Sequence, residues 1–262
     1  MGTLWIGRRK KAKSVIATYI EASGNFNATA RMYFDSEECI GAALDRMSVR
    51  SDIVTATKTA KANTLENISL MRKDLEESLR NLKTDYVDIY RLCHQSDDPD
   101  VIETCLLEIE QLKKEDKLLL RGIYIKVQNV TQDTAYLLNQ YINNGKIDAL
   151  QLIYSIFRQG NAQVFEQAHQ AGVGIIARTV LESGFLTGKY DGQSRFPEGD
   201  HRREWSPQQL QRFKEASDRI AGRVLEPSFE TIAQLTIKFS QAPPEVTTLI
   251  LGAWTPSQAE RN

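Results

Sequence analysis

The sequence of 262 residues has few cysteines and no long apolar run, and these shortages exclude several kinds of protein. Its three cysteines, Cys39, Cys93 and Cys105, are odd in number and have the spacing of neither a disulfide framework nor a zinc site. No apolar run approaches the ~20 residues that a membrane-spanning helix needs. We therefore expect a cytoplasmic protein with free thiols, no metal site and no membrane contact.

The sequence also has no excess of charge of one sign. Its 33 lysine and arginine residues nearly balance its 34 aspartate and glutamate residues, for a formal net charge of -1. A field that recruits nucleic acid is therefore not expected. A P-loop and a serine-nucleophile signature are also missing. No G-x-G-x-x-G turn follows an expected strand, which argues against a Rossmann domain.

Short apolar segments and amphipathic helical segments alternate along the whole sequence, which is typical of parallel β/α units. Helices are expected at 36–47 and 64–82, among others, from apolar residues at helical spacing. The long polar connection 182–205 is interpreted as a lid or binding loop. Eight strands predict a single-domain α/β fold, a (β/α)8 barrel over residues 1–262. The expected strands are 3–6, 25–28, 53–58, 86–92, 118–125, 147–154, 173–178 and 246–251.

Several segments together resemble the aldo/keto reductase family. The run NFNATARMYFDSEECIGAAL, residues 25–44, and the strand IVTATK, residues 53–58, are similar to the family's second and third strands. Similar segments cover nearly the whole sequence, and they are TDYVDIY (84–90), QLIY (151–154), GFLTGKY (184–190), RFPEGDHR (195–202) and LGAWTPSQAERN (251–262). The resemblance implies a barrel that reduces a small aldehyde or ketone with NADP(H).

The resemblance also implies the catalytic residues. Tyr33 would protonate the carbonyl oxygen, and Lys58 would lower the pKa of that phenol from its ordinary value near ~10. Ala28 stands where the family has an aspartate that pairs with the lysine, and Cys93 stands where it has a histidine, one residue before His94. Because adjacent strand residues face opposite ways, Cys93 and His94 cannot both point into the site. Either a local shift lets His94 take the histidine's role, or that role is vacant.

Cys93 itself allows two interpretations. A thiol beside Lys58 could have a depressed pKa and act as a nucleophile. We favour the simpler interpretation, in which a small buried residue fills the space that an imidazole leaves.

By the same resemblance, a set of residues would bind the dinucleotide. Gln151 would contact the nicotinamide amide and Tyr154 would stack on its ring. Tyr124 and Ile125 replace a Ser-Asn pair, which puts a large ring where nicotinamide would lie. Trp254 replaces the arginine that pairs with the 2′-phosphate, so NAD is possible beside NADP. The other implied cofactor contacts are Thr179, Leu181, Gly184, Leu186 and Gly188 in the loop after strand seven, and Gln258 and Asn262 at the adenine.

Two hypotheses about function follow. The first is an NADP(H)-dependent aldo/keto reductase acting on a small carbonyl compound. The second is a barrel of the same descent that no longer reduces carbonyls and serves as a regulatory or structural subunit, or runs a non-redox reaction. The changes at Ala28, Cys93, Tyr124, Ile125 and Trp254 favour this second hypothesis, because they fall in the site.

The family usually has an N-terminal hairpin under the barrel and a last helix with a C-terminal tail. This sequence lacks the hairpin and most of the last helix and tail. A last strand without its flanking helix would expose apolar surface, which usually marks a contact with another chain. We therefore expect a homo-oligomer or a partner protein.

Overall fold

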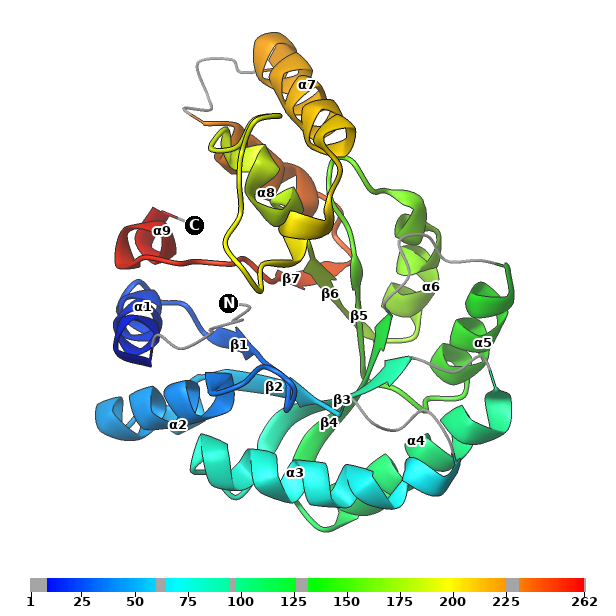
Figure 1. The fold of residues 1–262 in the computed structure, drawn as a ribbon. Helices are drawn as coiled ribbons and strands as arrows, with labels where there is room; N and C mark the ends of the chain where they lie inside the picture. The colour runs from blue at the N-terminus through cyan, green and yellow to red at the C-terminus, as the bar shows by residue number, and fades with distance from the viewer. Residues whose placement is uncertain (1–8, 60–64, 95–97, 126–131, 225–230, 262) are drawn as a thin grey trace.

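The computed structural model describes residues 9–59, 65–94, 98–125, 132–224 and 231–261. In these ranges, seven parallel strands form one curled sheet, in which each strand pairs with the next along the chain (Figure 1). The strands are β1 (Phe26–Ala28), β2 (Val54–Lys58), β3 (Val87–His94), β4 (Leu118–Ile125), β5 (Ala149–Ile153), β6 (Gly174–Arg178) and β7 (Val246–Leu249).

Helices surround the outer side of this sheet (Figure 1). The α-helices are α1 (Arg9–Glu21), α2 (Ser36–Met47), α3 (Ser69–Leu82), α4 (Pro99–Lys114), α5 (Gln132–Asn143), α6 (Phe165–Gln170), α7 (Pro207–Val224), α8 (Ile232–Gln241) and α9 (Pro256–Arg261). The short 3-10 helices are η1 (Arg50–Asp52), η2 (Leu65–Asn67), η3 (Gly160–Val164), η4 (Glu182–Thr187) and η5 (His201–Glu204). The first helix, α1, packs against the last, α9, so the helical layer connects the two edges of the sheet.

The predicted order of strands and helices is confirmed over the described ranges. Helix α2 and strand β4 have the predicted bounds, and the helix predicted at 64–82 is α3 preceded by η2. The strand predicted at 3–6 lies outside the described residues. The α/β fold is therefore seen as a curled barrel of seven described strands. The connection 182–205 contains η4 and η5 rather than being free of secondary structure.

Local sequence explains where several helices begin. Before α4, Asp98 accepts a hydrogen bond from the backbone N–H of Asp100 at 3.0 Å, and Pro99 opens the helix. Before α8, Thr231 and Gln234 form a reciprocal capping box with hydrogen bonds of 3.1 and 3.2 Å. These side chains satisfy backbone N–H groups that have no partner within the helix.

The alternation of side chains along the strands divides the buried residues into two layers. The outer layer joins the sheet to the helices and includes Tyr90, Leu92, Ile123, Leu150 and Leu152. The inner cluster fills the bottom of the barrel, and its buried members are Phe26, Ala28, Ala56, Ile89, Ala149 and Ile176. This inner cluster supports the polar residues that follow it on the same strands.

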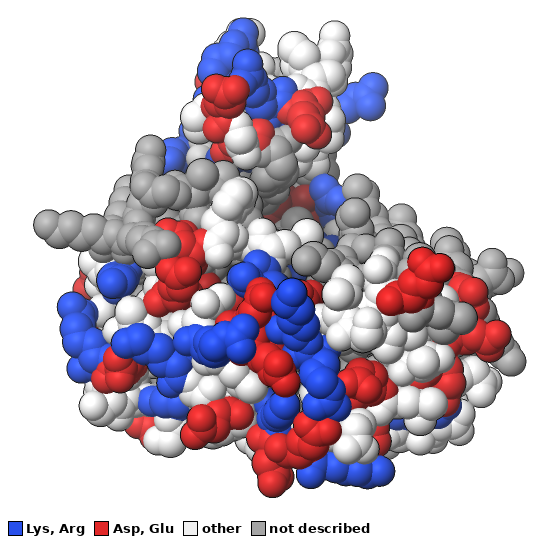
Figure 2. Space-filling view, turned by 60° about the horizontal axis from the view of Figure 1, so that its bottom comes forward, with Lys and Arg blue, Asp and Glu red and all other residues white. Residues whose placement is uncertain are grey.

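Charges of both signs are mixed on the surface. On the face that Figure 2 shows, lysine and arginine side chains are interspersed with aspartate and glutamate. Arg72 of α3, for example, pairs with Glu108 of α4 at 3.1 Å. Within the described ranges, every helix is too short or too polar to cross a lipid bilayer.

The contact between α2 and α3 makes a first testable prediction. A Cβ at Gly41 would lie 2.6 Å from the carbonyl carbon of Leu82, which is backbone and cannot move aside. We expect Gly41→Ala to lower the free energy of unfolding by about 1–3 kcal/mol. Gly222→Ala is the matched control, because a Cβ on this exposed position of α7 has no described atom within 4 Å.

The control is expected to raise the free energy of unfolding by about 0.5–1 kcal/mol, the ordinary gain from glycine to alanine in a helix. Urea unfolding followed by circular dichroism measures both variants. Equal effects of the two substitutions would contradict the packing that we describe.

Candidate active site

A ring of polar side chains lies on the inner face of the sheet, just beyond the inner cluster. Lys58, Arg91, Gln151 and Arg178 each follow a member of that cluster by two residues on the same strand. Because side chains alternate along a strand, these residues share the inner face. Register pairs Lys58 with Arg91 across β2 and β3. The four side chains therefore meet near the carboxyl ends of the strands, where barrels of this type carry their chemistry.

The two residues implied as proton donor and pKa tuner are in contact. Nζ of Lys58 donates a hydrogen bond to Oη of Tyr33 at 2.9 Å and lies 4.2 Å from the centroid of that ring. Lys58 is 3% exposed, and Tyr33, in the loop after β1, is half-buried. The phenol thus lies between the buried ammonium and the open end of the barrel.

The ammonium of Lys58 lies in an unusual electrostatic environment. Ala28 is buried on the inner face of β1 and offers no charge. Glu37 acts on Lys58 more weakly than Arg91 does, and its carboxylate accepts hydrogen bonds from Thr57 Oγ1 at 2.7 Å and Asn81 Nδ2 at 3.3 Å. Burial, followed by the charge of Arg91, holds the pKa of Lys58 well below its ordinary 10.5.

The pKa of Tyr33 moves in the opposite direction to the one that the resemblance implies. Burial raises it above the ordinary 10.0, and Tyr124 adds to the rise, while Arg91 and Arg178 oppose it. Burial outweighs the cations because the phenolate would lose its hydration. Tyr33 therefore holds its proton at neutral pH and can donate it.

Tyr124 lies between two cations. Its ring centroid is 4.9 Å from Nζ of Lys58 and 4.6 Å from Cζ of Arg178. The electron-rich faces of Tyr33 and Tyr124 therefore offset part of the charge of Lys58, in the place of a carboxylate. The structure thus places a large ring between Lys58 and Arg178.

Arg91 is a functional-site residue that the sequence reasoning missed. It is fully buried, and it donates hydrogen bonds to the carbonyl oxygens of Thr29 at 3.1 Å, Ala56 at 2.9 Å and Thr57 at 3.3 Å, and to Oε1 of Gln151. Burial lowers its pKa to about 10, so it remains a cation at neutral pH. The signal was its position in DIYRLCH, two residues before Cys93 and hence on the same face.

A glycine on the next strand makes room for this arginine. A Cβ at Gly122 of β4 would lie 2.6 Å from Cγ of Arg91. The side-chain carbonyl of Gln151, predicted to bind the nicotinamide amide, is engaged by Arg91. Arg178, also missed, donates to the carbonyl oxygen of Ile125 and to Oγ1 of Thr179, at 3.1 and 3.2 Å.

Tyr154 does not face the interior. It is 6% exposed and packs edge-on against Phe165 of α6 and stacked on Phe239 of α8, with ring centroids 5.0 and 5.8 Å apart. Tyr154 comes directly after β5, and it belongs to the layer of buried residues between the sheet and the helices, whereas Gln151 lies on the inner face. The predicted stacking of Tyr154 on nicotinamide is therefore wrong in this arrangement.

The structure places Cys93 on the inner face of β3. It is 6% exposed, pairs in register with Tyr124, and acts electrostatically on Lys58 and Tyr33. The side chain of His94 lies outside the described residues. A buried thiol among cations is in the position that the resemblance assigns to the histidine.

The loop after β6 contains the residues implied to contact the pyrophosphate. Thr179 and Gly184 have φ of 65 and 95°, and Gly188 has 72°, so the chain turns tightly there. A Cβ at Gly184 would lie 2.7 Å from the Tyr190 ring, which requires glycine at this position. Leu186 is fully buried beneath the turn. Leu181 opens it, accepting a hydrogen bond from the N–H of Gly184 at 2.8 Å and of Leu186 at 3.2 Å.

The residues implied to contact adenine lie at the start of α9. Trp254 is 44% exposed, and its backbone N–H donates to Oε1 of Gln258 at 2.7 Å. The carbonyl of Gln258 is thus used to order the turn before the helix. Asn262 lies outside the described residues.

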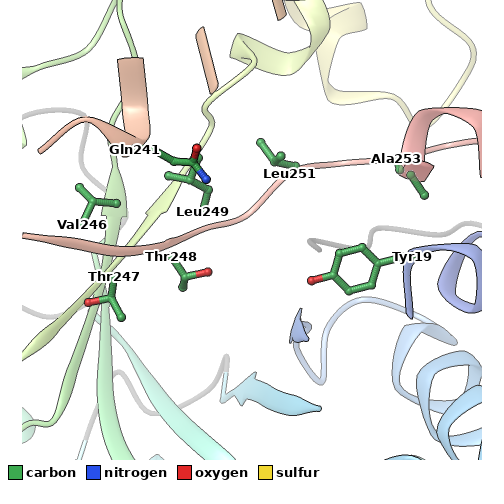
Figure 3. A pocket seen from close by; sticks show the side chains of 9 residues that line it. Tyr19, Gln241, Val246, Thr247, Thr248, Leu249, Leu251 and Ala253 are labelled. Carbon is green, nitrogen blue, oxygen red and sulfur yellow. The ribbon is translucent and has the colours of Figure 1, made fainter. Parts of the chain in front are cut away.

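The cavity drawn in Figure 3 lies beside β7. Its volume is about 420 Å³, and it separates β7 from α1 and α9. The residues that line it are Tyr19, Gln241, Val246, Thr247, Thr248, Leu249, Leu251, Ala253 and Ala259. Lys58, Arg91, Gln151 and Arg178 are not among them, so we place the chemistry at the lysine.

The environment of Lys58 makes a second testable prediction. We expect Lys58→Met to raise the free energy of unfolding by on the order of 1 kcal/mol at neutral pH, because it removes a buried charge. The gain should shrink as pH rises from the lowered folded pKa of Lys58 toward 10.5, because the wild-type lysine is then neutral in both states.

Guanidinium chloride unfolding at pH 7 and pH 10 tests the second prediction. Lys238→Met, on the exposed face of α8, is the matched control and should change stability little at either pH. A gain that grows with pH would contradict the lowered pKa.

Comparison with known proteins finds similar sequences and similar folds. An uncharacterized oxidoreductase, YqkF of Bacillus subtilis (strain 168), is 25% identical over an alignment of 276 positions, which covers 100% of this chain and 84% of the relative. The aldo-keto reductase AKR11C1 from Bacillus halodurans, in its holo form, has a TM-score of 0.77 and 23% identity, covering 100% of this chain and 84% of that one.

An aldo/keto reductase from Klebsiella pneumoniae, solved in complex with NADP and acetate, has a TM-score of 0.72 and 21% identity over 100% of this chain and 83% of its own. At these identities the two solved structures show a shared barrel fold. The model of the Aldo/keto reductase family matches residues 2–262. Since that match spans almost the whole sequence, the protein belongs to the aldo/keto reductase family.

Proposed function

We propose that the protein reduces a small aldehyde or ketone with NADP(H). The observation that carries the proposal is the hydrogen bond of 2.9 Å between Lys58 and Tyr33 at the carboxyl ends of the strands. A proton donor and a cation beside it are what carbonyl reduction requires, because negative charge develops on the carbonyl oxygen.

The residues at the end of β6 fit part of a dinucleotide. Arg178 and Thr179 form a cationic and hydroxyl donor set beside the tight turn, which suits an anionic group such as a pyrophosphate. Trp254 is exposed and can stack on adenine but cannot neutralise a 2′-phosphate. We propose NADP as cofactor because a relative of the same fold is solved with it, with NAD as the alternative.

When bound, the cofactor supplies a hydride to the carbonyl carbon. Tyr33 gives its phenolic proton to the carbonyl oxygen. Lys58 keeps its hydrogen bond to the phenol oxygen and so stabilises the phenolate that forms. Arg91 and Arg178 favour the same phenolate through their charge. Tyr124 and Cys93 border the space in which the carbonyl would lie.

A second candidate is a barrel of this family that has lost carbonyl reduction and acts as a regulatory or structural subunit. The observations that favour it are a buried alanine, Ala28, at the position of the family's aspartate, and Cys93 at the position of its histidine. In either case we propose assembly with a second copy or a partner protein. We also propose a cytoplasmic location, because Cys39, Cys93 and Cys105 are buried free thiols.

Removal of the phenol hydroxyl makes a third prediction. Tyr33→Phe is expected to lower kcat/KM for NADPH-dependent reduction of small aldehydes by about 10²-fold or more, because the proton donor is lost. Dinucleotide binding should be unchanged. Tyr86→Phe, at a half-buried tyrosine whose ring lies beside Arg50, is the matched control and should keep full activity. A Tyr33→Phe variant with full activity would assign the proton to another group.

Dinucleotide binding makes a fourth prediction. NADPH and NADH, titrated separately, are expected to quench tryptophan fluorescence saturably, because Trp254 lies where the adenosine end would dock. Trp254→Phe should remove most of the quenching. If neither dinucleotide bound at concentrations up to about 1 mM, which is weak affinity, hydride transfer would be ruled out and the subunit role favoured.

A further inference from the structure

The carboxylate of Glu182 is a buried charge that the proposed reduction does not use. Glu182 is the first residue of η4, in the loop after β6, and it is fully buried. Burial raises the pKa of its carboxyl group above the ordinary 4.5, while Ser155 and Arg158 act to lower it. A buried carboxylate is costly unless both of its oxygen atoms have partners, so the contacts of Glu182 have to be well fixed.

Both oxygen atoms of this carboxylate are held by the loop that follows β5. Ser155 Oγ donates a hydrogen bond to Oε1 of Glu182, and Nε of Arg158 donates to Oε2 at 2.9 Å. Ser155 and Arg158 also exchange backbone hydrogen bonds of 3.2 and 3.0 Å, which fix these two residues relative to each other. The carboxylate therefore fastens the loop after β6 to the loop after β5.

The backbone that carries Glu182 needs such a fastening. Glu182, Ser183 and Gly184 have φ of 46, 55 and 95°, and the first two have a Cβ, which makes left-handed backbone unfavourable. Backbone in this region persists where the surrounding contacts hold it. A second arginine, Arg202, donates through Nη1 to the carbonyl oxygen of Ser183 at 2.8 Å. Arginines from two different loops thus hold consecutive residues of the turn.

The backbone N–H of Glu182 connects this fastening to the proposed cofactor contacts. It donates a hydrogen bond of 2.9 Å to the carbonyl oxygen of Thr179, which itself has φ of 65°. Oγ1 of Thr179 in turn accepts a hydrogen bond of 3.2 Å from Nη1 of Arg178. The positions of the Thr179 hydroxyl and the Arg178 guanidinium therefore depend on the backbone conformation that Glu182 keeps.

We propose that Glu182 is a positioning residue for dinucleotide binding, whose carboxylate keeps the turn in the shape that presents Arg178 and Thr179 to a diphosphate. The diphosphate is that of the proposed cofactor, so this role rests on the proposed function. The side-chain hydrogen bonds of Glu182 go to Ser155 and Arg158, away from the proton donor, so it acts on affinity and not on proton transfer. A turn that is ordered before the ligand arrives binds more tightly, because no further ordering has to accompany binding.

Calorimetric titration with ADP and with NADPH tests this role. ADP carries the diphosphate without nicotinamide, so its binding reports on the turn whether or not a carbonyl compound is reduced. We expect Glu182→Gln, which cannot form the ion pair with Arg158, to raise the dissociation constants of both ligands about tenfold, a typical effect of losing a residue that orients a ligand-binding group. In aldehyde reduction, KM for NADPH should rise while kcat is unchanged.

Two further variants separate positioning from a loss of stability. Asp148→Asn breaks the ion pair of 2.9 Å with Arg121 beside the amino end of β5, and it should lower stability while leaving both dissociation constants unchanged. The double variant Arg158→Met/Glu182→Leu replaces the buried pair with apolar side chains, a change that proteins usually tolerate. Because it lacks the carboxylate, we expect it to bind both ligands as weakly as Glu182→Gln does.

Unchanged affinity for ADP in the double variant would overturn the positioning role, even if Glu182→Gln fails to fold. A wild-type protein that does not bind ADP would overturn it too. The same holds if Asp148→Asn loses affinity to the same extent, because the effect would then follow from stability alone. A wild-type protein that binds ADP but reduces no aldehyde would overturn the proposed reduction alone, and the affinities for ADP would still decide the role of Glu182.

Discussion

The polar end of the barrel depends on the hydrogen bonds that the guanidinium of Arg91 donates. Its hydrogen bonds reach the carbonyl oxygens of Thr29, Ala56 and Thr57 and the side chain of Gln151, and so connect β3 with the β1 loop, β2 and β5. A buried cation is costly unless its donors are satisfied, and here backbone oxygens satisfy them. Removal of any strand in this set would leave buried N–H groups without acceptors.

That same cation sets the electrostatics of the site. Its charge disfavours the ammonium of Lys58 and favours the phenolate of Tyr33, so it acts to lower the pKa of both groups. Burial acts on both in the direction of the neutral form. The pair therefore consists of a protonated phenol and a lysine that gives up its proton readily, and the aromatic faces of Tyr33 and Tyr124 replace a carboxylate as its stabilising surroundings.

The inner face of the barrel keeps some residues of the family's site and changes others. Tyr33 and Lys58, which we propose as proton donor and its partner, are kept, whereas Ala28 and Cys93 stand where the resemblance implies a carboxylate and an imidazole. The changes fall on the inner face, not on the packing layer that holds the barrel together. Stability and chemistry are thus carried by opposite faces of the same strands, which allows the site to change while the fold persists.

The sequence by itself determined the order of strands and helices, because the spacing of apolar residues that is typical of a helix or a strand depends only on neighbouring residues. Helix α2 and strand β4, for example, have the bounds that this spacing predicts. The motifs NFNATARMY and IVTATK also identified Tyr33 and Lys58 as a pair. Only the tertiary structure decided that Tyr154 faces the helices and that Arg91 holds Gln151. Alternation along a strand gives two faces, but which face is the interior depends on curvature and on what packs against each side.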